Sequence, residues 1–191
     1  MSRPLTNIAH ERVEANIVPG SSAIDATAGN GHDTLFLARA LGTQGRVLAI
    51  DIQAAAIAQT HLRLEQHGLL ERTTLVQGDH QHLRHFVQQK GLDSICTVMF
   101  NLGYHPGGKR DITTTPASTI LAIKAALNLL RTTGGMLSVM AYRGHPGGAE
   151  EAEQVKDILC SQQTTHHPSS PHLTTIATPS PTGPVLYTLN I

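Results

Sequence analysis

The sequence predicts an α/β fold in which a doubly wound, mostly parallel sheet forms a single domain over residues 1–191. Three observations support this prediction. Short apolar runs alternate with amphipathic stretches along the chain, as strands connected by helices do. The last two strand-like runs are separated by TPSPTG, which is too short for a helical crossover and predicts a C-terminal antiparallel hairpin. A chain of 191 residues is also the size of one domain with one core.

The first expected element is an amphipathic helix near the N-terminus. Apolar side chains recur at helical spacing at Leu5, Ile8, Ala9, Val13 and Ile17. The Pro19-Gly20 pair ends this helical pattern. We expect the helix to lie across the sheet rather than to bind a ligand.

The remaining elements alternate between strands and helices as far as the final hairpin. Apolar, β-branched runs bounded by turn residues predict strands over 22–28, 46–51, 73–79, 94–102, 135–141, 173–177 and 184–191. Helical periodicity predicts helices over 32–41, 53–67, 81–89, 116–131 and 148–163. Helical crossovers cover both faces of a parallel sheet. Five such units closed by a hairpin resemble the class I methyltransferase fold, whereas dinucleotide dehydrogenases usually keep the sheet parallel to its end.

The charge balance excludes a global electrostatic field. The 14 Lys and Arg residues are matched by 14 Asp and Glu residues, so any RNA binding must come from a local patch. The 12 histidines would make the chain basic near pH 6, so we expect the affinity for an anion to depend on pH. Three Phe, three Tyr and no Trp provide no platform for stacking single-stranded bases.

Neither a signal peptide nor a membrane-spanning segment is predicted, because no apolar stretch is long enough. We therefore expect a cytoplasmic protein, and the sequence leaves a monomer and a homodimer open. The two cysteines, Cys96 and Cys160, have no spacing typical of a disulfide framework or a zinc site. We expect free, buried thiols.

In open α/β sheets, ligands bind outside the carboxyl ends of the strands. The first turn at this edge, residues 25–33, contains Gly29 and Gly31, which allow the backbone to bend tightly and approach a ligand. The helix that follows presents unpaired N–H groups to an anion. The dinucleotide fingerprint GxGxxG is not met, because Thr34 occupies the third glycine position, so a structural tight turn explains this segment almost as well.

Two further turns favour an adenosine site. Asp51 ends the second strand about 20 residues beyond Gly31, where a carboxylate can accept both ribose hydroxyls. Gly78-Asp79-His80 follows the third strand, at the usual place for a side chain that contacts an adenine amino group. Each carboxylate alone is compatible with an ordinary surface residue. Three such turns at consecutive strand ends favour the binding of an adenosine.

The fourth turn, over residues 100–109, is the expected acceptor site. Asn101 and Tyr104 have the spacing of the Asn-Pro-Pro-Tyr motif of methyltransferases that act on exocyclic amines, with Leu102-Gly103 in place of the prolines. An Asn carbonyl can accept the amine N–H and aim its lone pair, and an aromatic face can receive a cationic methyl donor. A glycine-rich loop with an Asn cap is also compatible with this turn taken alone.

A second aromatic-His-Pro-Gly-Gly segment, residues 142–148, leaves the fifth strand. We expect the two segments to form two walls of an acceptor pocket, although each is also compatible with a simple strand-to-helix break. Lys109, Arg110 and Arg143 would give this edge a local positive charge for phosphate contacts.

Three histidines near the third turn, His80, His82 and His85, have a spacing that suggests a metal. No Cys or carboxylate stands at ligand spacing, so we expect helix histidines in solvent, with His80 near the cofactor, and no metal.

Five segments together give the chain a close resemblance to a small bacterial family labelled putative rRNA methylases, and the resemblance spans nearly the whole chain. They are DATAGNGHDTLFLA (25–38), DIQ (51–53), FNLGYHPGGKR (100–110), TTTPASTILAI (113–123) and YRGHPGG (142–148) with Glu151. The family includes the tRNA methyltransferase that converts 5-aminomethyl-(2-thio)uridine to 5-methylaminomethyl-(2-thio)uridine at the wobble position.

The resemblance implies an S-adenosylmethionine-dependent enzyme that methylates this aminomethyl nitrogen, with the anticodon region of tRNA as its partner. With the turns above, it predicts cofactor contacts from Asp25, Thr27, Gly29, Asn30, Gly31, His32, Asp33, Asp51, Gln53, Asp79 and His80. It predicts catalytic roles for Asn101 and Tyr104. The predicted substrate contacts are Lys109, Arg110, Tyr142, Arg143 and His145.

Some alternatives stay open at this point. Lys109-Arg110-Asp111 stands where an acidic residue commonly follows the glycine pair in the family, which bears on the substrate more than on the cofactor. An rRNA, a small amine, or a non-catalytic role as an adenosine-binding regulatory module is compatible with the same turns. His32, His105 and His145 are equally good candidates to accept the amine proton.

Overall fold

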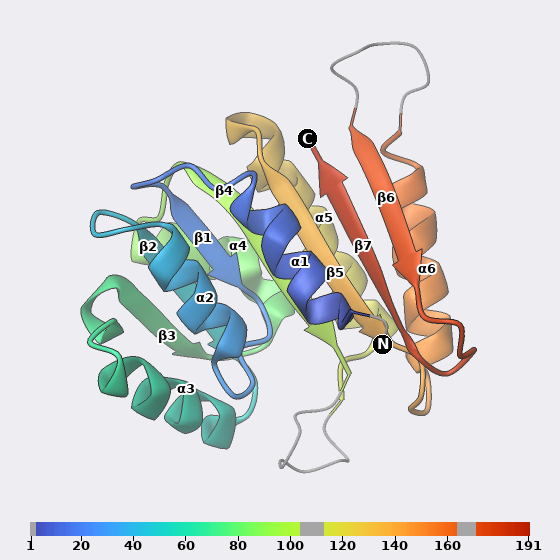
Figure 1. Cartoon of the computed structure of the whole chain (residues 1–191), viewed down its shortest axis with the longest axis horizontal. Coiled ribbons are helices and arrows are strands. Elements are labelled where there is room, and N and C mark those ends of the chain that lie inside the picture. Colours follow the sequence, from blue (N-terminus) through green and yellow to red (C-terminus); the bar gives the residue numbers. More distant parts are fainter. Residues whose placement is uncertain (1–2, 104–112, 164–170) are drawn as a thin grey trace.

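The computed structural model describes residues 3–103, 113–163 and 171–191 of the chain. Figure 1 shows one twisted sheet with helices packed against it. Its strands are β1 (Ser22–Asp25), β2 (Arg46–Asp51), β3 (Thr73–Gln77), β4 (Ile95–Leu102), β5 (Met136–Tyr142), β6 (His172–Ala177) and β7 (Pro184–Asn190). They lie in the order β3-β2-β1-β4-β5-β7-β6. The predicted fold, a mostly parallel sheet closed by a C-terminal hairpin, is confirmed.

The strand order creates a switch point beside β1. The chain runs outward from β1 to β2 and β3, and then returns to place β4 on the other side of β1. These four strands and β5 are parallel, whereas β7 runs antiparallel to both β5 and β6. Loops that leave β1 and β4 therefore diverge from neighbouring strand ends, which is where this class of sheet binds ligands.

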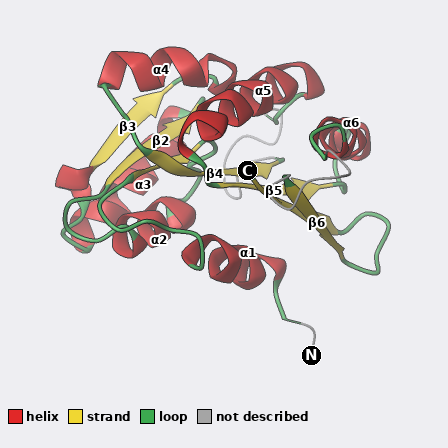
Figure 2. Ribbon diagram, turned by 90° about the horizontal axis from the view of Figure 1, so that it is seen from above, coloured by secondary structure: helices red, strands yellow, loops and turns green. Residues whose placement is uncertain are grey.

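The helices cover both faces of the sheet, as the alternating pattern predicts. They are α1 (Leu5–Glu14), α2 (His32–Ala40), α3 (Ala54–Gln66), α4 (Leu83–Lys90), α5 (Pro116–Thr133) and α6 (Gly148–Cys160), with short 3-10 turns η1 (Leu70–Arg72) and η2 (His80–His82). Figure 2 shows α1, α2 and α3 on one face and α4, α5 and α6 on the other.

Apolar side chains of the central strands form a core on each face. Leu48, Phe100 and Leu137 are fully buried on the α4, α5 and α6 side. Leu37 and Leu64 are fully buried on the α1, α2 and α3 side. Every residue of β4 is buried except Asn101, near the carboxyl end of the strand, which is partly exposed. The core thus holds β4 in place and leaves Asn101 accessible near its carboxyl end.

Several boundaries differ from the sequence-based expectation. Helix α1 ends at Glu14, and Ile17 packs against the core from the following turn. The helix expected from residue 81 begins as the 3-10 turn η2 and becomes α-helical at Leu83. Cys96 is buried as expected, but Cys160 is exposed at the end of α6. None of the described helices has the length and apolar character needed to cross a membrane.

Candidate functional site

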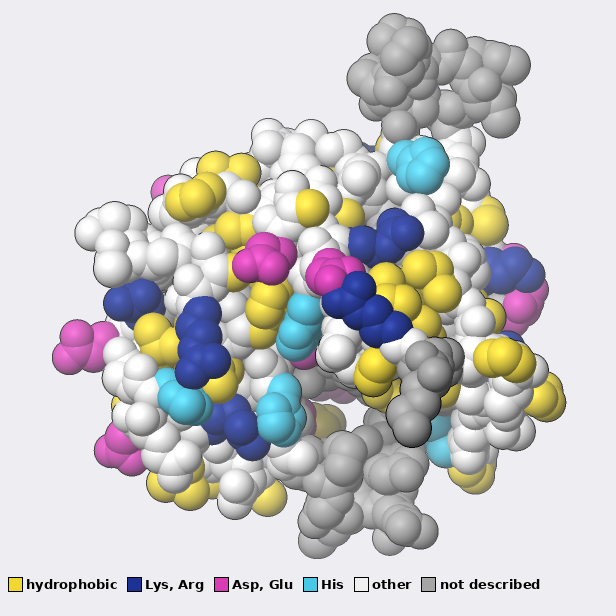
Figure 3. Space-filling model, in the orientation of Figure 1, with side chains coloured by type: hydrophobic (Ala, Val, Ile, Leu, Met, Phe, Trp, Pro, Cys, Tyr) yellow, Lys and Arg dark blue, Asp and Glu magenta, His cyan; other side chains and the backbone are white. Residues whose placement is uncertain are grey.

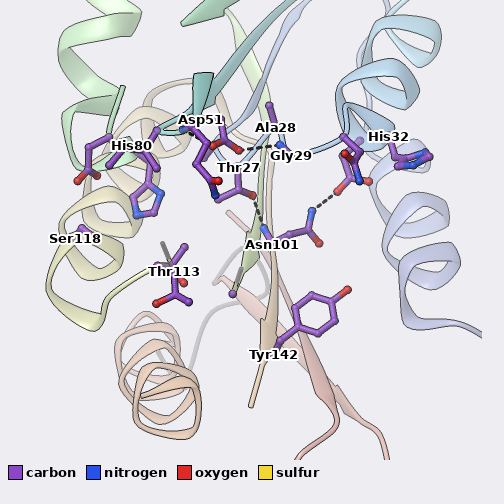
Figure 4. A pocket seen from close by; sticks show the side chains of 18 of the residues that line it. Thr27, Ala28, Gly29, His32, Asp51, His80, Asn101, Thr113, Ser118 and Tyr142 are labelled. Carbon is purple, nitrogen blue, oxygen red and sulfur yellow. Dashed lines mark hydrogen bonds between the residues drawn. The ribbon is translucent and has the colours of Figure 1, made fainter. Parts of the chain in front are cut away.

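A pocket with a volume of about 340 Å³ opens at the carboxyl ends of the parallel strands, within the size range of ligand sites. Eleven of the predicted residues line it: Thr27, Gly29, Asn30, His32, Asp33, Asp51, Gln53, Asp79, His80, Asn101 and Tyr142. Figure 4 shows His80, Thr113 and Ser118 on one side of the central Asp51 and Thr27, and Asn101, Tyr142 and His32 on the other. The four predicted turns thus meet in one cavity.

The first turn is held against α3 by a close backbone approach. Gly29 and Gly31 have φ angles of +52° and +76°, in the left-handed region that favours glycine. A Cβ atom on Gly31 would lie 2.9 Å from Cα of Thr60, and the Thr60 hydroxyl donates to the Gly29 carbonyl at 3.1 Å. Gly31 does not line the pocket, so its role is to let the turn pack closely on α3.

Asp25 lies beneath this turn rather than in the pocket, contrary to the expectation that it contacts the cofactor. Its side chain is fully buried and accepts hydrogen bonds from the Thr34 hydroxyl at 2.6 Å and the Thr27 amide at 3.2 Å. Burial, followed by repulsion from Asp33, raises the pKa of Asp25 to about 7. Thr34, which breaks the dinucleotide fingerprint, is therefore the hydroxyl that holds Asp25.

Asp51 joins the first two turns. One carboxylate oxygen accepts from the Gly29 amide and the other from the Gln53 amide, both at 2.9 Å. The side chain lines the pocket and stays partly exposed. An ionised carboxylate can accept about four hydrogen bonds, so two remain for hydroxyl groups of a ligand. Ile52, 52% exposed beside it, gives the rim an apolar surface that the polar motif did not reveal.

His80 is a buried polar group with an unused acceptor. Its side chain lines the pocket and packs edge-on against Phe100 with ring centroids 5.9 Å apart. Burial lowers its pKa, which favours the neutral imidazole. Its Nε2 atom is buried without a hydrogen-bond partner among the described residues. The neighbouring Asp79 instead accepts from both the backbone and the side-chain amide of Gln81.

Asn101 is held from two directions. Its backbone N–H donates to the Thr27 hydroxyl at 2.6 Å, and its Nδ2 donates to Asp33. The second oxygen of Asp33 lies 2.6 Å from Nε2 of His10, and the His10 ring stacks on Phe36 with centroids 4.0 Å apart. Helix α1, which we expected to bind nothing, thus contributes His10 to this network and Thr6 to the pocket lining. No sequence motif indicated either residue.

The opposite wall is fixed by a buried carboxylate. Glu151, 1% exposed at the start of α6, accepts from the hydroxyls of Thr114 at 2.7 Å and Thr119 at 2.6 Å. The amide of Thr114 donates to the Gly103 carbonyl at 3.1 Å. These bonds position the segment that brings Thr113, Thr114 and Ser118 to the pocket. The family resemblance included this segment and Glu151, but the sequence did not indicate what roles they have.

The other residues predicted near the acceptor lie partly in the pocket, partly outside its lining and partly outside the described residues. Tyr142 lines the pocket, and burial together with the charge of Asp33 raises its pKa. Arg143 is directed to the β6–β7 turn, where it donates to the carbonyls of Gly183 and Ser180. His145 lies outside the pocket lining, and its Nδ1 lies 3.0 Å from the Pro146 carbonyl. Tyr104, His105, Lys109 and Arg110 lie outside the described residues.

Residues 3–103, 113–163 and 171–191 contain no group of three His, Cys, Asp or Glu side chains that could hold a metal ion. His82 and His85, which raised the metal question, are exposed on η2 and α4.

Comparisons with known proteins relate the chain to methyltransferases. The model of a family described as "Putative rRNA methylase" matches residues 47–178. A chloroplastic tRNA (mnm(5)s(2)U34)-methyltransferase of Arabidopsis thaliana is 37% identical over 186 residues, which cover 88% of this chain and 67% of that protein. The ribosomal RNA small subunit methyltransferase H of Brevibacillus brevis is 33% identical over 46% of this chain, but the match spans 27% of that protein.

Solved structures resemble the whole chain. A putative rRNA-methylase from Clostridium thermocellum has a TM-score of 0.85 and 34% identity, with both chains fully covered. A putative methyltransferase from Streptococcus mutans, solved in complex with SAH, has a TM-score of 0.82 and 30% identity over 100% of this chain and 99% of that one.

Proposed function

The chain belongs to the rRNA methylase family whose model it matches, and from this premise we propose that it methylates the aminomethyl nitrogen of 5-aminomethyl-(2-thio)uridine at the tRNA wobble position. It is an S-adenosylmethionine-dependent methyltransferase, as its relatives and the SAH complex of a structural neighbour indicate. The observation that carries the proposal is the juxtaposition of Asn101 with the predicted cofactor turns in one pocket.

The pocket residues fit S-adenosylmethionine. Asp51 has acceptor capacity left for the two ribose hydroxyls. The unpartnered Nε2 of His80, buried at the pocket wall, is an acceptor that suits an exocyclic amino group of adenine. The exposed face of Ile52 offers apolar contact to a base. Carboxylates of Asp33 and Asp51 also line the cavity and favour a ligand with a cationic centre.

The bound cofactor supplies an electrophilic methyl group on a sulfonium. The chain's own contribution is alignment and exclusion of water, because an in-line transfer depends mainly on the relative placement of the reacting groups. Asn101 presents its amide into the pocket beside Asp33 and Tyr142. Its carbonyl oxygen can accept one N–H of the substrate amine and thereby direct the nitrogen lone pair.

The substrate amine must lose a proton before it reacts. Free alkylammonium groups titrate well above pH 7, so a nearby acceptor assists the reaction. His32 lines the pocket, and burial of part of its ring together with the charge of Arg63 lowers its pKa. A lowered pKa keeps the imidazole unprotonated near neutral pH, so that a ring nitrogen is open to a proton from the amine, as a weaker base than free imidazole.

A wobble uridine is favoured over rRNA by the extent of the two relationships. The tRNA methyltransferase of Arabidopsis thaliana aligns with 88% of this chain, whereas the ribosomal RNA enzyme of Brevibacillus brevis aligns with 46%. The partial match still makes rRNA the second candidate acceptor, and both RNAs belong in the same assay.

Replacement Asn101→Ala tests the assigned role. The cofactor should still bind, because the replacement removes only one bond to the predicted cofactor turns, the one from Nδ2 to Asp33. The substrate amine, in contrast, loses the carbonyl oxygen that orients its nitrogen. We expect turnover on tRNA carrying 5-aminomethyl-(2-thio)uridine to fall about a hundredfold or more. Calorimetry with S-adenosylhomocysteine should show little change in affinity.

A matched variant, Thr113→Ala, removes a hydroxyl from the opposite wall without touching the Asn101 network. Near-normal turnover in Asn101→Ala would refute the catalytic assignment. Loss of cofactor binding in that variant would show that Asn101 supports the pocket rather than the amine.

A further inference from the structure

We propose that His10 of α1 is a positioning residue that acts through Asp33 to fix the side-chain amide of Asn101. This inference rests on the proposed function, because it explains how the residue that guides the amine is itself oriented. His10 lies outside every motif that indicated the site. Helix α1 would thus help to orient the residue that binds the substrate amine.

Hydrogen-bond chemistry determines which end of the Asn101 amide points to the substrate. An ionised carboxylate accepts hydrogen bonds and donates none. The group that faces Asp33 must therefore be the NH₂ of Asn101, as the contact between Nδ2 and Asp33 shows. The amide oxygen then points away from Asp33. Without Asp33 the amide could rotate and offer its NH₂ to the substrate, which would repel an amine N–H.

Asp33 is in turn held by His10. One carboxylate oxygen accepts from Asn101 and the other lies 2.6 Å from Nε2 of His10, so the two contacts use opposite oxygens and fix the plane of the carboxylate. The pair is mostly shielded, with side-chain exposures of 28% for His10 and 13% for Asp33. A shielded, charge-assisted pair holds its geometry better than an exposed one.

The His10 ring has its own support. It stacks on Phe36 of α2, with ring centroids 4.0 Å apart and planes inclined by 2°. Phe36 belongs to the same helix as Asp33, so α2 supplies both the acceptor for His10 and the surface that orients its ring. The chain from Phe36 through His10 and Asp33 to Asn101 connects α1, α2 and β4.

Two variants separate the two contacts that His10 makes. His10→Phe keeps an aromatic ring on Phe36 and removes the donor to Asp33. His10→Gln keeps an amide donor and removes the stack. If the donor matters, His10→Phe should lower the single-turnover methylation rate by about tenfold and leave S-adenosylhomocysteine affinity within about twofold, while His10→Gln recovers most of the rate. Glu14→Ala, an exposed change on the same helix, controls for general disturbance of α1.

Two readouts distinguish positioning from a structural role. In an Asn101→Ala background, His10→Phe should cause no further loss of rate, because the group it positions is gone. In the ¹⁵N NMR spectrum, the side-chain amide signal of Asn101, identified by its absence in Asn101→Ala, should move in His10→Phe and stay in place in Glu14→Ala.

Additive losses in the double variant, or an Asn101 amide signal unmoved by His10→Phe, would overturn the positioning role. If the wild-type protein fails to methylate the tRNA, the proposed function fails, while the NMR comparison still decides whether His10 orients Asn101.

Discussion

At the scale of single residues, the carboxylates in and near the pocket have different roles. Asp51 and Asp33 line the pocket, and their oxygens already accept hydrogen bonds from other residues of the protein. Asp25 is buried beneath them, and its pKa is raised to about 7 by burial first and by Asp33 second. Three negative charges in so small a volume would repel one another. Keeping Asp25 partly protonated near neutral pH relieves that repulsion.

The raised pKa of Asp25 predicts a pH-dependent stability. A carboxyl whose pKa rises from 3.8 when unfolded to about 7 when folded binds its proton more tightly in the folded state. Its contribution to the free energy of unfolding is therefore complete below about pH 4 and is lost as the pH rises to about 7. Asp25→Asn removes the titration and keeps the shape.

Thermal unfolding of both proteins across this pH range checks the point. The melting temperature of the wild type should fall relative to that of Asp25→Asn from about pH 4 to pH 7, and the difference should then level off. A constant difference across the range would show that Asp25 keeps an ordinary pKa in the folded protein.

Residue types at strand ends predicted much of the pocket, because chemistry at a known edge of the sheet restricts which side chains can meet. Asp51, Asp79 and Asn101 all line the cavity as expected. The burial of Asp25 was not predictable, since its partner Thr34 looked like a departure from a fingerprint rather than a hydrogen-bond donor. His10 was equally hidden, because a histidine on an amphipathic helix gives no sign of its spatial neighbours.

At the scale of elements, the packing of α2 and α3 determines the shape of the first turn. The turn must adopt a left-handed conformation at Gly31 and pass against the backbone of Thr60. The sequence predicted the helices from their periodicity but not this contact. Helix α1 shows the same limit, since its apolar face predicted that it covers the sheet, whereas its polar edge reaches the pocket.

Gly31→Ala and Gly42→Ala form a matched pair that isolates the packing contact. Their φ angles are +76° and +75°, so the backbone strain of an added methyl group is similar in both. A methyl on Gly31 meets Thr60 at 2.9 Å, whereas one on Gly42 has no atom within 4 Å. We expect Gly31→Ala to lower the free energy of unfolding by about 1–3 kcal/mol more than Gly42→Ala.

Urea denaturation measures the difference, and calorimetry with S-adenosylhomocysteine should show weaker binding for Gly31→Ala alone. Equal stability of the two variants would mean that α3 can move aside and that the turn is not held by this contact.

At the scale of the whole molecule, the charge distribution bears on how the proposed RNA substrate would bind. The chain has no net charge, and Figure 3 shows basic, acidic and histidine side chains interspersed over the face that carries α1, α2 and α3. Arg143, which the sequence assigned to RNA, donates to two carbonyls of the β6–β7 turn. We propose that Lys109 and Arg110, which lie outside the described residues, supply the local positive charge expected at the acceptor edge.

Salt dependence of tRNA binding tests this assignment. Removing one side chain that neutralises a phosphate should flatten the slope of log affinity against log salt by about 0.7–0.9. The double variant Lys109→Ala/Arg110→Ala should flatten the slope by about 1.5, while Arg143→Ala should leave it close to that of the wild type. The reverse pattern would place the RNA beside the β6–β7 turn.

The fold itself was predictable at this scale, because the alternation of strands and helices and the short final connection define both the parallel sheet and its hairpin. The identity of the acceptor was not, because the class I fold carries many reactions. Two observations narrow the choice of acceptor. Asn101 lines the same pocket as the predicted cofactor turns, and the chain is similar to a tRNA methyltransferase.

The most direct test is therefore the identity of the methylated nucleoside. Purified protein is incubated with labelled S-adenosylmethionine and tRNA carrying 5-aminomethyl-(2-thio)uridine, beside the same tRNA lacking the aminomethyl group and beside rRNA, and the digested nucleosides are analysed by mass spectrometry. We predict that the label enters the aminomethylated tRNA alone, as 5-methylaminomethyl-(2-thio)uridine. Equal labelling of tRNA that lacks the amine, or labelling confined to rRNA, would contradict the proposed reaction.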